Sequence, residues 1–429
     1  MFLPASLAIT TDALRKNELD LFTYVDEICK RIDEAEPQLH ALLPETDRRM
    51  RLRADAQALQ ARFPDPATRP PLYGVPVSIK DVFFVDGFPT RAGSNLPAEV
   101  FVGAEAPCVT MLREAGAIIL AKTVSTEFAY FEPGPTRNPH NLAHTPGGSS
   151  SGSAVAVVVG FCPLALGTQT IGSTIRPAAF CGVVGFKPSY GRIPTDGIIP
   201  CSPSVDTVGF FTQDVVSAAI VAPLLCGNWQ PGEATRKPVL GVPEGPYLTQ
   251  ASEEALVAFT KQLAQLEHAG YTIRHVTIMN DIEEIIQRHM RMVFAEMAQV
   301  HTHWFAQYAS LYRPRTVAAI REGQTVDAGE LAAAREGRIK LRADLEVTMA
   351  QHAIDIWVCP SAPGPAPEGI SSTGSPLMNL PWTHAGLPAI SLPAGQASNG
   401  LPLGLQCIAT FMADERLIAW AEPIAEVLQ

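Results

Sequence analysis

Two clusters of glycine, serine and threonine are the residues of this sequence whose types best suit chemistry on a ligand. They read TPGGSSSGSA over 145–154 and TQTIGST over 168–174, and each adjoins an apolar stretch. Glycine lets the backbone approach a ligand closely, and successive peptide N–H groups in such turns form a donor site for an anion or a developing oxyanion. One cluster alone is typical of an ordinary turn. Two clusters beside apolar segments favour a functional site.

A serine nucleophile needs a base, and Lys80 is the candidate. It follows the alternating pattern of 75–79 and has apolar neighbours. Burial would favour the neutral lysine, which can accept a proton in a Ser–Lys arrangement. The alternative is an ordinary lysine at a strand end that reaches solvent beside a salt partner, Asp81.

Other chemistries fit the residues less well. The G-x-S-x-G pattern is absent, and no lysine follows GGSSSGS in the position that a nucleotide-binding loop requires. His289, His301 and His303 lack the i, i+4 spacing of a zinc-binding helix, so we predict a packed or surface role for them. His140, His144 and His384 stay open as pocket residues.

The elements that must position these residues alternate between helix and strand. Apolar residues at steps of three and four predict helices within 12–62, and a further helix to about Arg113 precedes a strand at 117–121. This alternation predicts an α/β sheet with helical layers. Turn formers predict a long loop over 131–148. Helical patterns dominate 243–350 before strand signals return, so we expect one domain over 1–429.

Composition limits the class of protein. The 429 residues carry a net charge of −11 and are 47% hydrophobic, which indicates a globular protein and argues against nucleic-acid binding. The eight cysteines form no CxxC pair and predict buried, reduced thiols. No apolar run reaches the length of about 18 residues that a membrane span needs. The N-terminus lacks the positive region of a signal peptide, so we predict a cytoplasmic protein.

The sequence resembles the amidase signature family of serine hydrolases. The resemblance rests on GGSSSGSAVAVVVGFCPLALGTQTIGSTIRPAAFCGVVGFKPSYGRIP over 147–194, on LYGVPVSIKDVF and GAIILAKTVSTEFAY before it, and on AGLPAISLPAG near the C-terminus. It implies the amidase signature fold, a central mixed β-sheet covered by α-helices on both faces. The regions about 1–62 and about 243–350 would then be an N-terminal helical region and a helical cap-like insertion.

The resemblance also implies a mechanism. Ser173 takes the place of the nucleophile, Ser149 that of a bridging serine after a cis peptide bond, and Lys80 that of the base. The oxyanion hole would consist of the N–H groups of Thr170, Ile171, Gly172 and Ser173. Residues expected to contact the substrate are Glu127, Phe128 and Gly148. No metal or cofactor is required.

The sequence departs from the family pattern at three places. Gln169 replaces an aspartate, Ile171 replaces a glycine, and Ile175 holds the place of an arginine, with Arg176 following. In relatives that act on acidic substrates, that arginine can hold a carboxylate, so its displacement argues against acidic substrates.

We therefore expect an amidohydrolase that cleaves the C–N bond of neutral or apolar carboxamides, and also aryl esters and carbamates. One alternative is the glutaminase subunit of a tRNA-dependent amidotransferase. Another is a catalytically silent binding protein on the same fold. The expected partner is a small-molecule amide or carbamate, with no nucleic acid and no membrane, and the family suggests a homodimer.

Overall fold

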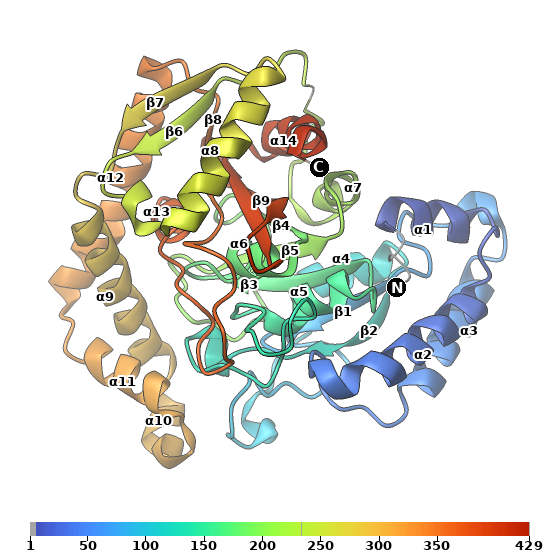
Figure 1. The fold of residues 1–429 in the computed structure, drawn as a ribbon. Coiled ribbons are helices and arrows are strands. Elements are labelled where there is room, and N and C mark those ends of the chain that lie inside the picture. The colour runs from blue at the N-terminus through green and yellow to red at the C-terminus, as the bar shows by residue number, and fades with distance from the viewer. Residues whose placement is uncertain (1–5, 233, 429) are drawn as a thin grey trace.

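The computed structural model describes residues 6–232 and 234–428. Within them, ten strands form one mixed sheet in the order β2-β1-β3-β5-β4-β9-β10-β8-β6-β7 (Figure 1). Pairing is parallel among β2, β1 and β3 and among β8, β6 and β7, and antiparallel between these groups. The strands are β1 Pro76–Lys80, β2 Ile118–Thr123, β3 Leu164–Gln169, β4 Val184–Lys187, β5 Thr207–Thr212, β6 Leu240–Glu244, β7 Ile273–Thr277, β8 Ile356–Pro360, β9 Ala389–Gln396 and β10 Pro402–Ile408. The mixed sheet expected from the sequence is confirmed.

Three helices precede the sheet: α1 Leu7–Arg15, α2 Leu21–Leu39 and α3 Arg48–Arg62. The predicted apolar stripe of α2 is buried at Val25, Ile28 and Ile32. Asp20 begins this helix, because its carboxylate accepts the N–H of Thr23. Helix α3 packs on the edge strand β2, so these helices cover that end of the sheet (Figure 1).

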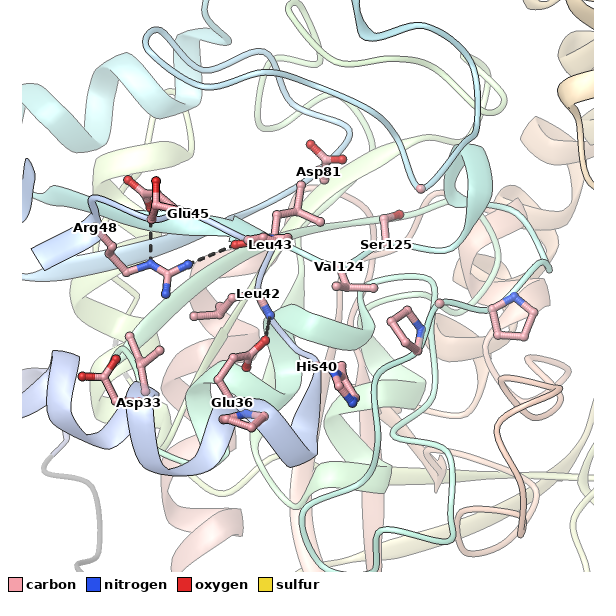
Figure 2. Close-up of a pocket in the computed structure, with 18 of the residues that line it drawn as sticks. Asp33, Glu36, His40, Leu42, Leu43, Glu45, Arg48, Asp81, Val124 and Ser125 are labelled. Atoms are coloured by element: carbon pink, nitrogen blue, oxygen red, sulfur yellow. Dashed lines mark hydrogen bonds and ion pairs between the residues drawn. The ribbon is translucent and has the colours of Figure 1, made fainter.

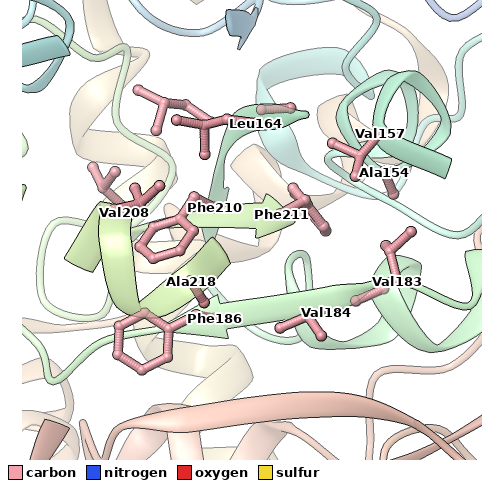
Figure 3. Packing of buried hydrophobic residues seen from close by; sticks show 14 of the residues in the cluster. Ala154, Val157, Leu164, Val183, Val184, Phe186, Val208, Phe210, Phe211 and Ala218 are labelled. Atoms are coloured by element: carbon pink, nitrogen blue, oxygen red, sulfur yellow. The ribbon is translucent and has the colours of Figure 1, made fainter. Parts of the chain in front are cut away.

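Helices pack on both faces of the central strands. They are α4 Pro107–Glu114, α5 Ser151–Val158, α6 Ile175–Cys181, α7 Val215–Leu225 and α14 Asp414–Leu428. Successive residues of a strand point to opposite faces, and β5 does so with Phe210 and Phe211. Phe210 packs on Phe186 beside Ala218 of α7, whereas Phe211 lies towards α5 (Figure 3). The two faces thus have separate helical layers.

Between β6 and β8 the chain makes a long excursion that returns to the sheet only for its edge strand, β7. The two ends of this excursion adjoin, because Asp355 donates its N–H to the carbonyl of Val239 at 2.9 Å. Between them lie α8 Glu253–His268, β7, α9 Ile282–Val300, α10 Thr302–Tyr308, α11 Pro314–Gly323 and α12 Ala328–Gln351. Strand β7 was not anticipated within the helical pattern of 243–350. It is an edge strand with largely exposed side chains, so it has no apolar alternation.

Several smaller expectations also hold. The stretch from 131 to 148 contains no helix, and α5 begins only at Ser151. All eight cysteines, each within the described residues, are buried free thiols. The short helix α13 Leu380–His384, which was not predicted, precedes β9. In the described ranges, no helix combines the length and apolarity needed to cross a bilayer.

Candidate active site

Lys80 ends strand β1 and is fully buried. Its Nζ atom donates to Ser149 Oγ at 2.6 Å and to Thr168 Oγ1 at 2.7 Å. Asp81, the salt partner considered for it, instead lies 2.8 Å from Lys122 Nζ. The alternative of a solvent-exposed lysine at a strand end is therefore wrong, and the described chain places no carboxylate within ion-pair distance of Lys80.

The surroundings of Lys80 favour its neutral form. Burial lowers the pKa of its ammonium group to about 7, against a weaker opposing attraction from the buried Asp206 carboxylate. A large fraction of the amine is thus unprotonated near neutral pH. Such an amine can take a proton from the hydroxyl group that it contacts.

Ser149 lies in the turn that leads into α5. The peptide bond between Gly148 and Ser149 is cis, as the resemblance implies. The carbonyl of Ser149 accepts the N–H of Thr126 at 3.2 Å. One glycine of this cluster is required for packing: a Cβ at Gly152 would collide with the carbonyl oxygen of Ala41. That glycine brings α5 against the 41–42 segment, and with it the turn that carries Ser149.

Ser173 follows strand β3 and shares a small cavity with Ser149. The cavity is lined by Ala129, Tyr130, Phe131, Ser149, Thr170, Ile171, Gly172, Ser173, Arg176, Cys201 and Pro376. It therefore contains both predicted serines and the four predicted oxyanion residues, and Lys80 contacts one of the two serines. Two hydroxyl groups and a run of peptide groups thus line one cavity, and a buried lysine contacts one of the hydroxyls, an arrangement that suits acyl transfer.

Gln169 holds the turn of Ser173 at its start. Its Oε1 atom accepts the N–H groups of Thr174 and Ile175 at 2.8 and 3.0 Å, and its Nε2 atom donates to Thr383 Oγ1 at 2.9 Å. The glutamine thus supplies acceptors as an aspartate would, and adds a donor. This explains how the turn tolerates the departure from the family pattern.

Asp206 fixes the same turn from the other side, and the sequence analysis did not identify it. Its carboxylate accepts the Thr170 hydroxyl at 2.5 Å and the N–H groups of Cys201 and Ser202. Burial raises its pKa to about 6. The signal available in the sequence was an aspartate at the start of an apolar strand, which is too common to be specific.

Arg176 lies in the wall of the cavity, although it is displaced in the sequence. Its side chain is 1% exposed, and Nη2 donates to the Gly148 carbonyl at 2.6 Å and to Thr373 Oγ1 at 3.1 Å. Its Nε and Nη1 atoms meet no acceptor among the described residues. Burial lowers its pKa to about 9, so the guanidinium is charged near neutral pH. The wall of the cavity therefore contains a buried cation, two of whose donor atoms have no partner among the described residues.

The predicted substrate contacts lie elsewhere. Glu127 accepts the N–H of Arg313 and the hydroxyl of Thr316, so its carboxylate caps the start of α11. Phe128 packs among aromatic rings, with His301 at 4.4 Å between ring centres. The carbonyl oxygen of Gly148 accepts a hydrogen bond from Arg176 Nη2. In the described part of the chain, the cavity is lined by residues 129–131 rather than 127 and 128. Their contact with substrate stays a prediction.

No histidine of the described chain lines this cavity, and four of those considered from the sequence contact protein groups. His289 and His384 are buried, with their Nδ1 atoms 3.2 Å apart. His140 and His144 each bond a backbone carbonyl, of Cys181 and Ala366. These contacts account for these four histidines by packing and hydrogen bonding.

A second cavity of about 760 Å³ lies between the end of α2 and the stretch 124–135 (Figure 2). Its walls include His40, Leu42, Arg48, Asp81 and Ser125. Glu36 accepts the backbone N–H of Leu42, and Arg48 pairs with Glu45, so these charged groups already have partners in the wall. It contains neither serine of the candidate site, and we assign no reaction to it.

Comparisons with known proteins agree with this geometry. The sequence model of a family described as Amidase matches residues 23–418. A glutamyl-tRNA(Gln) amidotransferase subunit of Prochlorococcus marinus is 30% identical, over 99% of this chain and 98% of that one. A crystal structure of an amidase superposes with a TM-score of 0.89 at 32% identity, over 98% and 99% of the chains. The peptide amidase of Stenotrophomonas maltophilia gives 0.83 at 26%, over 99% and 97%.

Proposed function

The chain belongs to the amidase signature family of amide-hydrolysing enzymes, and we propose that it cleaves the C–N bond of a carboxamide through an acyl-enzyme on Ser173. One observation carries the assignment of residues: the buried Lys80 donates to Ser149 at 2.6 Å with no carboxylate beside it in the described chain. A lysine that has no counterion and contacts a hydroxyl group is suited to act as a base.

The proposed reaction begins when neutral Lys80 takes the proton of Ser149, which takes that of Ser173. The Ser173 oxygen then attacks the amide carbonyl, and the N–H groups of 170–173 stabilise the oxyanion. The proton returns through Ser149 to the leaving nitrogen, so the amine departs neutral and the acyl group stays on Ser173. Water then attacks the acyl-enzyme by the same route and releases the carboxylic acid.

Arg176 supports a substrate whose acyl part carries a carboxylate. A buried guanidinium with two unoccupied donors favours an anion over a neutral group, because charge-assisted hydrogen bonds are the stronger ones. This differs from the expectation of neutral or apolar amides, which stays a prediction.

The same chemistry fits the second candidate, a glutaminase subunit. Curated relatives aligned over nearly the whole chain have the name of an amidotransferase subunit, including that of Halothermothrix orenii at 29% identity. Glutamine has a primary carboxamide, which Ser173 would attack, and a carboxylate, which Arg176 would bind. The two candidates differ in whether the chain needs a partner subunit.

Turnover of a small panel tests the proposal. An aliphatic amide, succinamate, a p-nitroanilide, an aryl carbamate and glutamine are assayed with wild type and Ser173→Ala, and a fluorophosphonate probe is tested on both. We expect amide turnover and labelling in the wild type that vanish in Ser173→Ala. Glutamine turnover only after addition of a partner subunit would favour the second candidate. Labelling that persists in Ser173→Ala, or a wild type silent in every assay, would contradict Ser173 catalysis and revive a binding protein.

A further inference from the structure

Thr383 of α13 contacts the backbone of the turn that carries the proposed oxyanion donors. Its Oγ1 atom lies 2.8 Å from the carbonyl oxygen of Ile171, 3.1 Å from that of Asn379, and 2.9 Å from Gln169 Nε2. The amide of Gln169 is the donor in the last contact. The single hydroxyl proton therefore goes to a carbonyl, and Ile171 offers the shorter bond. Thr383 is 1% exposed.

The Ile171 carbonyl and the Gly172 N–H belong to one peptide unit. A trans peptide is planar, so these two groups point in opposite directions and cannot turn separately. A donor that fixes the carbonyl on one side thereby fixes the N–H on the other. Gly172 lies in the cavity of Ser149 and Ser173, and a side chain there would collide with Asn379 of the segment before α13.

We propose that Thr383 is a positioning residue for catalysis: its bond to the Ile171 carbonyl aims the Gly172 N–H at the oxyanion. The inference rests on the proposed function and adds a residue 210 positions away from the nucleophile Ser173 in the sequence. A preorganised donor costs no reorientation when negative charge develops, so its aim affects the rate of the chemical step.

The amide of Gln169 leaves the Thr383 hydroxyl free to donate to the Ile171 carbonyl, because Gln169 is itself the donor to Thr383. A carboxylate at this position could accept the N–H groups of Thr174 and Ile175, but it has no donor for Thr383. The Thr383 hydroxyl would then turn its proton to the carboxylate, and the Ile171 carbonyl would lose its donor. Gln169→Glu is therefore expected to act like the loss of the Thr383 hydroxyl, with almost no change in size.

The test compares Thr383→Val, Thr383→Ser and Gln169→Glu with a matched control, Thr212→Val. Thr212 is also buried and donates to a backbone carbonyl, that of Asp214 at 2.8 Å, on a strand outside the cavity. We expect about 10- to 100-fold lower kcat in Thr383→Val and Gln169→Glu, with KM within about twofold. Thr383→Ser and Thr212→Val keep kcat within about threefold of wild type.

A second readout follows the same donors without turnover. The rate at which a fluorophosphonate labels Ser173 falls in parallel with kcat in Thr383→Val and Gln169→Glu, because the phosphoryl oxygen of the probe develops charge where the substrate oxyanion does. Thermal melting of each variant shows whether it is folded. If Thr383→Val does not fold, Gln169→Glu decides the question.

The experiment distinguishes a failure of the proposed function from a failure of the role assigned to Thr383. A wild type that neither turns over amides nor reacts with the probe overturns the proposed function. An active wild type with unchanged kcat and labelling rate in folded Thr383→Val and Gln169→Glu overturns the role of Thr383. A raised KM at constant kcat, or an equal loss in Thr383→Ser, overturns it as well.

Discussion

Asp81 follows Lys80 in the chain, yet its carboxylate lies 2.8 Å from the Nζ atom of Lys122 on the neighbouring strand. Both partners of this ion pair are almost completely buried, at 1% and 2% side-chain exposure. Lys122 thus binds the carboxylate that is closest to Lys80 in the sequence. Lys80 is thereby left with hydroxyl partners only, and this is what allows burial to bring its pKa near 7.

Breaking the Asp81–Lys122 pair should destabilise the fold. Lys122→Met leaves a buried carboxylate without its cation, and we expect a loss of about 3–5 kcal/mol in the free energy of unfolding. The double variant Asp81→Leu/Lys122→Met should recover most of it. Urea denaturation checks both. The control is Lys340→Met, which breaks an exposed ion pair with Asp344 and should cost less than about 1 kcal/mol. Equal losses at the two sites would contradict the interpretation.

The pH dependence of activity should show the titration of Lys80. Its neutral form acts as the base, so kcat/KM should rise with pH through about 7 and then level off. Lys187 provides a matched control, because burial lowers its pKa to about 7 as well, while its Nζ donates to the carbonyls of Pro188 and Leu387. Lys187→Met should keep the rising limb, and Lys80→Met should abolish activity. A limb that disappears in Lys187→Met would contradict the assignment.

The lowered pKa of Lys80 also predicts a pH-dependent stability. Between about pH 7 and 10.5 the unfolded chain binds a proton at this lysine that the folded protein has released. The free energy of unfolding from this group therefore rises with pH across that window, and is constant below it. Lys80→Met lacks this dependence, so its stability relative to wild type should fall by about 4 kcal/mol from pH 7 to pH 10. Chemical denaturation at both pH values measures the difference, and a constant difference would contradict the shift.

Substitution of Arg176 should change substrate preference. Arg176→Gln removes the cation but keeps a donor, so we expect kcat/KM for succinamate to fall about 10- to 100-fold, in line with the loss of a charge-assisted hydrogen bond. Butanamide, which has a methyl group in place of the carboxylate, should be affected less than about threefold. Steady-state kinetics on this substrate pair measures the effect. The same loss on both substrates would show that Arg176 supports the fold of the cavity and does not bind a carboxylate.

Glu127 allows its two interpretations to be separated. If its carboxylate caps α11, Glu127→Ala should lower the free energy of unfolding by about 1–3 kcal/mol, because it leaves the N–H of Arg313 and the Thr316 hydroxyl without a partner. Thr316→Val should then show coupling with it in a double-mutant cycle. If Glu127 binds substrate, KM would rise while the stability stayed unchanged. Denaturation and kinetics on the same variants distinguish the two results.

The sequence predicts best those parts of the site whose local pattern is strong. The alternation of 75–79 places Lys80 at the end of a strand, and the glycine-rich stretch after β3 identifies the turn of Ser173. The layers of helices follow from periodicity and from the resemblance. Strand β7 was missed because its side chains are largely exposed, and exposure removes the apolar signal.

Contacts between distant segments could not be predicted. Gln169 and Thr383 are 214 residues apart, and no local pattern indicates that they bond. The position of the Arg176 side chain could not be predicted either, because the arginine is shifted from position 175 to 176. One residue turns a helix by about 100°, which suggests that the side chain is lost from the cavity. The long guanidinium side chain of Arg176 nevertheless lies in the cavity wall, and only the tertiary structure reveals this.

The adjoining ends of the excursion from β6 to β8 have a consequence for protein engineering. Val239 and Asp355 are hydrogen bonded, so everything between them closes a loop whose ends the sheet already holds together. The entropy of closing a loop grows only slowly with its length, so changes in the length of its exposed turns should cost little, whereas its buried residues, such as Val242, Met292 and Met349, must be kept or matched. Lys80, Ser149 and Ser173 all precede it. Grafts here would vary the surroundings of the cavity around a constant reaction centre.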